Sequence, residues 1–111
     1  MTETLDRSRV AALNDIFRRS LSGGTLVLTA GVIALGRERQ QIILDAVAAF
    51  DRFDADNDPH GEHDWGALTA ARERVCWRID CFDRSRSRAS PDPADASVTA
   101  RVLTVMLAGE Y

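Results

Sequence analysis

Residues 25–30, TLVLTA, form a continuous aliphatic and β-branched run that ends at Gly31. Successive side chains of a strand point to opposite faces, so a run without polar alternation predicts a strand that is buried on both sides. The whole chain has 111 residues, of which 45% are hydrophobic, and this is the size of one domain with one core. We therefore expect residues 25–30 to form the central strand of a sheet.

Apolar residues at helical spacing predict two helices around this strand. The first covers residues 5–21 and the second residues 37–52, and glycines at positions 23 and 24 follow the first. Glycine adopts the left-handed conformation that ends many helices. The apolar stripes that define the two helices are Val10, Leu13, Ile16, Phe17 and Leu21 in the first, and Ile42, Ile43, Ala46, Val47 and Phe50 in the second.

The second half of the chain predicts a hairpin and a third helix. Residues 65–71 and 74–82 have strand character, and residues 84–95 form a polar connection. Asp92 and Pro93 suit a helix start, and Gly109 suits a helix end. We therefore expect a helix over residues 93–108, whose apolar face would consist of Val98, Val102, Val105 and Met106.

These elements predict one α+β domain over residues 1–111, in the order α-β-α-β-β-α. Three helices would pack against a small, mostly antiparallel sheet. The chain has no apolar run of 18 or more residues, and its first residues, MTETLDRSR, are acidic where a signal peptide is basic. We expect a cytoplasmic protein with no membrane contact and with Cys76 and Cys81 as free thiols on opposite faces of one strand. The sequence leaves the oligomeric state open.

The charge balance bears on the class of partner. The chain carries 17 acidic and 14 basic residues, a net charge of −3, and this argues against a nucleic-acid binder that relies on bulk electrostatics. Every basic residue is an arginine. Arg84, Arg86 and Arg88 alternate with serines in a basic loop, which is either a solvated connection or a contact for phosphate.

The stretch AFDRFDADNDPHGEHDWG, residues 49–66, concentrates acidic residues and both histidines. Its carboxylates are Asp51, Asp54, Asp56, Asp58, Glu62 and Asp64. The Asp54-x-Asp56-x-Asp58 spacing resembles the start of a calcium loop. However, Pro59 stands where the turn needs glycine, and Trp65 stands where the closing glutamate belongs.

Three catalytic interpretations of this stretch compete with a structural one. His60-Gly61-Glu62 matches half of a zinc deaminase signature, but no P-C-x-x-C half follows. A looser metal site could use His60, Glu62, His63 and Asp64, or His63 could be a general base oriented by a neighbouring carboxylate. No nucleophile motif accompanies either possibility.

The structural interpretation is a rigid loop that caps its own backbone and still exposes negative charge. Such a charged surface would attract a basic partner. Trp65 and Trp77 would then be core aromatics or, less commonly, interface anchors.

Several blocks of the sequence resemble one bacterial family. They are AALNDIFR, LTAGVIALG, AFDRFDADNDPHGEHDWGAL, VCWRIDCFDRS and SPDPADASVTARVLTVMLAGEY, and they span residue 9 to the carboxyl terminus. Together they resemble the short proteins grouped as domain of unknown function 3768. The resemblance implies a compact stand-alone domain that often accompanies mobile-element genes, and it implies no activity and no catalytic residue.

We therefore expect a small acidic, non-enzymatic interaction protein without a cofactor. Its partner would be a basic, nucleic-acid-handling protein, such as a host defence factor that it inhibits or adapts, and direct binding of nucleic acid is not expected. The alternative is a metal-assisted, hydrolase-like enzyme that uses His60, Glu62, His63 and Asp64. The residues expected to contact the basic partner are Asp54, Asp56, Asp58, Glu62, His63, Asp64 and Trp65.

Overall fold

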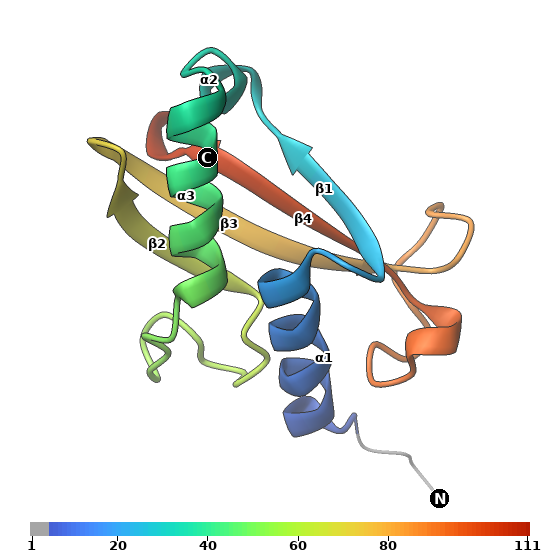
Figure 1. Cartoon of the computed structure of the whole chain (residues 1–111). Coiled ribbons are helices and arrows are strands. Elements are labelled where there is room, and N and C mark those ends of the chain that lie inside the picture. Colours follow the sequence, from blue (N-terminus) through green and yellow to red (C-terminus); the bar gives the residue numbers. More distant parts are fainter. Residues whose placement is uncertain (1–4) are drawn as a thin grey trace, which may run out of the picture.

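A four-stranded sheet carries two long helices on one face (Figure 1), as seen in a computed structural model that describes residues 5–111. Residues 1–4, part of the segment used above to argue against a signal peptide, lie outside the described residues. The elements are α1 (Arg7–Ser20), β1 (Gly24–Leu28), α2 (Ala30–Ile33), α3 (Arg37–Ala49), β2 (Trp65–Ala70), β3 (Glu73–Phe82) and β4 (Ala100–Leu107), with short 3₁₀ turns at Ala96–Val98 and Ala108–Glu110.

The strands lie in the order β1-β4-β3-β2. β1 runs parallel to β4, whereas β4 and β3, and β3 and β2, are antiparallel. The sheet is therefore mixed. The expectation of an α+β domain is confirmed, and the expectation of a mostly antiparallel sheet is corrected by the parallel β1 and β4 pair.

The expected helix over residues 93–108 is wrong, because residues 100–107 form β4, one of the two interior strands. The segment ARVLTVML satisfies both periodicities. Leu103 and Val105 are fully buried on the helix-covered face, while β-branched Val102 and Thr104 alternate with them on the other face and favour a strand. The supposed helix start is a local turn, in which the Asp92 carboxylate accepts a hydrogen bond from the Ala94 amide at 3.1 Å.

The TLVLTA run is not central, which corrects the first expectation. It forms β1 at the edge of the sheet, paired only with β4. Val27, on the face away from the helices, is 41% exposed. A run of apolar residues satisfied the pattern of a doubly covered strand, but the helices cover only one face (Figure 1).

The core lies between the helices and the inward faces of β3 and β4. α1 contributes Phe17 and α3 contributes Ile43 and Val47, which pack against Trp77 and Leu103 of the sheet. α1 ends at Ser20, and its C-cap Leu21 adopts the left-handed conformation two residues before the first of the expected glycines. Cys76 and Cys81 are both free, as expected, and burial raises the pKa of each thiol.

The β2 and β3 hairpin turns tightly at Ala71 and Arg72, which have positive φ angles of 52° and 63°. This turn usually selects asparagine and glycine. Here Arg39 of α3 donates two hydrogen bonds to the Ala71 carbonyl, at 2.7 and 3.3 Å, and fixes the turn against the helix. Across residues 5–111, none of the helices combines the length and the apolar character needed to cross a membrane.

Candidate functional site

The acidic stretch connects α3 to β2 as a loop that caps its own backbone. The Asp54 carboxylate accepts hydrogen bonds from the amides of Asp56 and Asn57, at 2.9 and 3.0 Å. Asn57 in turn accepts from the Asp54 amide and donates to the Arg52 carbonyl. The loop therefore has the self-capped geometry of the structural interpretation, while Asp54 and Asp56 stay exposed.

Asp58 turns inward and is only 8% exposed. Its carboxylate accepts hydrogen bonds from the amides of Glu62 and His63, at 3.1 and 3.3 Å. A carboxylate that holds two amides in this way stabilises the loop. Asp58 therefore shapes the loop and does not face an approaching partner.

His63 joins the loop to α1. Its Nδ1 lies 3.0 Å from the Asp15 carboxylate, and its ring stacks on Phe53 with centroids 3.9 Å apart. The residue has a positive φ of 54° and its side chain is 30% exposed. Asp15 also accepts a 2.9 Å hydrogen bond from the fully buried Arg18. The other ring nitrogen, Nε2, lies 3.7 Å from the Asp58 carboxylate, so His63 is held between two carboxylates at a strained backbone position.

The four residues of the metal alternative do not converge. His60 contacts Arg7 at 2.6 Å, whereas His63 contacts Asp15. Desolvation raises the pKa of the Asp64 carboxyl, and the charges of Asp58 and Asp80 add to the rise. Within the part of the chain that the structure describes, no three His, Cys, Asp or Glu residues are grouped so as to hold a metal ion.

The two tryptophans lie on opposite faces of the sheet. Trp77 is fully buried under the helices. Trp65 begins β2 on the other face, is half-buried, and lies with its ring 6.3 Å from that of Tyr111. Trp65 therefore faces away from the acidic loop's contact with α1.

Replacing Asp58 by alanine is expected to lower the free energy of unfolding by about 2 kcal/mol, because two partly buried amides lose a charged acceptor. Asp56→Ala is the matched control, since Asp56 is exposed in the same loop and should change stability by less than about 0.5 kcal/mol. Urea unfolding of both variants measures the difference. Equal stabilities would contradict the inward role of Asp58.

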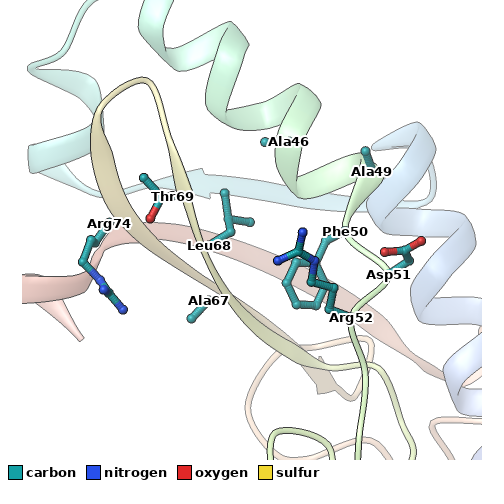
Figure 2. A pocket seen from close by; sticks show the side chains of 9 residues that line it. All are labelled: Ala46, Ala49, Phe50, Asp51, Arg52, Ala67, Leu68, Thr69 and Arg74. Carbon is teal, nitrogen blue, oxygen red and sulfur yellow. The ribbon is translucent and has the colours of Figure 1, made fainter.

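A hollow that the sequence did not predict lies between the end of α3 and strand β2. Its volume is about 620 Å³. Figure 2 shows its side chains between the helix and the hairpin, with Arg74 toward one end and Arg52 toward the other. The lining residues are Ala46, Ala49, Phe50, Asp51, Arg52, Ala67, Leu68, Thr69 and Arg74. We call this hollow the α3 and β2 groove.

The groove runs beside a free strand edge. β2 is the outermost strand and pairs only with β3. The Ile79 amide donates to the Asp64 carbonyl at 2.8 Å, and antiparallel pairs alternate, so Gly66, Leu68 and Ala70 also bond to β3. The backbone groups of Trp65, Ala67 and Thr69 consequently point outward. Six residues of edge strand without proline or lysine form an unprotected edge.

The groove combines an apolar floor with basic flanks. Phe50 and Leu68 lie among the packed core side chains, whereas Arg52 and Arg74 are exposed. Within residues 5–111 neither arginine forms an ion pair, although Asp51 also lines the groove. The only sequence signal for this site is the lack of proline and lysine in the short β2 segment. That lack indicates an open sheet edge only once the strand order is known.

The basic loop divides into two parts. Arg84 and Arg86 line a second hollow together with Gly23, Gly24 and Thr25, at the start of β1. Arg88 is exposed and does not line this hollow. The three arginines thus do not act as one row.

The fold and the groove define a small α+β protein with an open sheet edge beside a helix. The family described as protein of unknown function (DUF3768) matches residues 28–110, and the chain belongs to this family. The resemblance seen in the sequence is therefore confirmed, and α1 precedes the matched region. No curated protein and no solved structure matches the chain significantly.

Proposed function

We propose that the protein is an interaction module that binds an extended, acidic segment of a partner protein in the α3 and β2 groove. The observation that carries the proposal is the hollow of about 620 Å³ alongside the free edge of β2. A peptide can add a strand to such an edge, since main-chain hydrogen bonds supply affinity and adjacent pockets supply specificity. No residue of the groove needs to perform chemistry.

The free backbone groups of β2 determine where a bound segment would form hydrogen bonds. Ala67 and Thr69 both line the groove, and both direct their amide and carbonyl groups outward. A bound segment would therefore form alternate hydrogen bonds with these two residues. Every second side chain of the segment would point toward Phe50 and Leu68 on the apolar floor.

The charges of the groove select an acidic segment. Arg52 and Arg74 flank the floor without ion-pair partners among residues 5–111. Arginine pairs well with carboxylates because its planar guanidinium donates two parallel hydrogen bonds. Asp51 opposes this attraction in part, since it lies on the same groove.

A second candidate is the basic partner expected from the sequence. It is favoured by the exposure of Asp54 and Asp56, whose loop is fixed by the capping bonds of Asp54. In this version the protein inhibits or adapts a basic, nucleic-acid-handling protein, such as a defence factor. The two candidates predict opposite charges on the bound segment.

Selection of random displayed peptides on the full chain tests both candidates. We expect acidic peptides with apolar residues at alternate positions. Thr69→Pro should weaken their binding at least about tenfold, because it removes an outward amide. Proline is tolerated at edge positions whose amide lies outside the ladder, so the variant should fold.

Thr69→Val is the matched control, since it keeps the amide and the shape of the side chain. If Thr69→Pro and Thr69→Val bind the selected peptides equally well, the groove is not the peptide-binding site. Enrichment of basic peptides whose binding is lost in Asp54→Asn/Asp56→Asn would instead support the second candidate.

A further inference from the structure

The second hollow lies at the opposite edge of the sheet from the α3 and β2 groove, beside the start of β1. Its volume is about 370 Å³, and its lining contains no carboxylate. The lining residues are Gly23, Gly24, Thr25, Arg84, Arg86, Thr99, Ala100 and Arg101. Arg84 and Arg86 are exposed beside this hollow and form a local concentration of positive charge in a chain whose net charge is −3.

Arg86 is fixed in place at this hollow. Its Nη2 donates to the Thr25 hydroxyl oxygen at 2.5 Å, and its amide donates to the Asp83 carbonyl at 2.9 Å. The Asp83 carboxylate caps the same loop by accepting hydrogen bonds from Ser85 and Ser87, each at 3.0 Å. An arginine that is already ordered loses less conformational entropy when it binds an anion.

Arg101 is a buried cation with neutral partners. It is 4% exposed, and it donates from Nε to the Asn14 side-chain oxygen and from Nη2 to the Pro93 carbonyl. Among residues 5–111 neither Arg101 nor Arg84 forms an ion pair. The register of β1 and β4 pairs Thr25 with Val102 and Gly24 with Arg101, so the Arg101 side chain lies on the opposite face of the sheet from Thr25 and is not among the groups that would hold an anion.

We propose that this hollow binds the phosphoryl group of inorganic phosphate or of a small phosphate monoester. Guanidinium groups donate paired hydrogen bonds to phosphate oxygens. The Thr25 hydroxyl accepts from Arg86 and retains its own proton as a donor. Gly23 has a φ of 90°, and a Cβ there would meet nothing within 4 Å, so the entrance is open. This site is independent of the proposed peptide groove.

An NMR titration of the full chain tests the proposal, with inorganic phosphate, AMP and an oligothymidine without terminal phosphate as probes. We expect saturable shifts of the Gly23, Gly24 and Thr25 amides with phosphate or AMP. Saturation by phosphate alone would identify the free ion as the ligand, and tighter binding of AMP would identify an ester.

Arg86→Gln should weaken phosphate binding at least about tenfold, because a charge-assisted hydrogen bond is lost. Arg88→Gln removes the same charge from the same loop outside the hollow and should leave the affinity unchanged. Both side chains are exposed, so both variants should fold. Equal weakening by the two variants, shifts that fail to saturate, or binding of the oligothymidine alone would overturn the proposal.

Discussion

Arg18→Met is expected to lower the free energy of unfolding by about 3 kcal/mol, because it breaks the buried contact between α1 and α3. Arg18 is fully buried. Its Nη1 donates to the Val47 and Ala48 carbonyls at 2.7 and 3.0 Å, and its Nη2 donates to Asp15. The guanidinium thus donates to two carbonyl groups in the last turn of α3, one of which, that of Val47, also accepts from the Phe50 amide at 3.2 Å.

The aromatic residues around Arg18 add to this effect. Its guanidinium carbon lies 5.0 Å from the centre of the Trp77 ring and 5.6 Å from that of Phe53. The attraction between a desolvated guanidinium and an aromatic ring contributes about 2 kcal/mol. Methionine fills similar volume but removes the Arg18 donor from the Val47 and Ala48 carbonyls, and it leaves His63 as the side-chain partner of Asp15.

Urea unfolding of Arg18→Met beside Arg19→Met measures the loss. Arg19 is the next residue of the same helix and is exposed, so its replacement should change stability by less than about 0.5 kcal/mol. Adding Asp15→Leu to Arg18→Met should cost less than the sum of the two single changes, since in Arg18→Met the Asp15 carboxylate has already lost one of its two side-chain partners, Arg18 and His63. Equal effects of the two methionine variants would contradict the bridging role of Arg18.

Gly66→Ala is the second substitution with a large expected effect. It should lower the free energy of unfolding by about 2 kcal/mol or more, because it overpacks the core. Gly66 lies in β2 opposite Trp77. A Cβ at this position would lie 2.7 Å from Trp77 Cε2 and 2.9 Å from Phe50 Cε1, and it would also clash with Trp77 Nε1. Contacts this short cannot persist, so the fully buried indole, the Phe50 ring or the strand must shift.

Gly109→Ala controls for the change of residue type, because a Cβ at Gly109 would meet nothing within 4 Å. Thermal unfolding of both variants gives the comparison, and Gly109→Ala should retain the parent melting temperature within a few degrees. Gly66→Ala should also disturb the groove, because Phe50 forms part of its floor. A Gly66→Ala protein as stable as the control would show that the packing around Trp77 is looser than described.

The elements predicted correctly were those whose pattern fits a single periodicity. The helix expected over residues 37–52 is found at Arg37–Ala49, and the strand expected over 74–82 is found at Glu73–Phe82. In this segment only the 3.6-residue period places Ile43, Val47 and Phe50 on one face, because a strand would put Phe50 on the face opposite the other two. Residues 100–107 fit both periods, and the start and end signals at Asp92 and Gly109 belonged to local turns instead.

The site could be predicted only in part, because its contacts join distant residues. The self-capping of Asp54 depends on neighbours and was anticipated. The contact of His63 with Asp15 joins residues 48 apart, and no local pattern indicates it. The groove exists because β2 is an edge strand. The strand order that places β2 there includes β4, and the sequence pattern of β4 had predicted a helix.

Amide hydrogen exchange at Ala67 and Thr69, with and without a saturating selected peptide, tests the central claim most directly. These two amides point away from β3 and should exchange rapidly in the free protein. Binding along the groove should slow both of them while the amides of Asp56 and Asn57 stay unchanged. Unchanged exchange at Ala67 and Thr69, with protection confined to the acidic loop, would contradict recognition at the β2 edge.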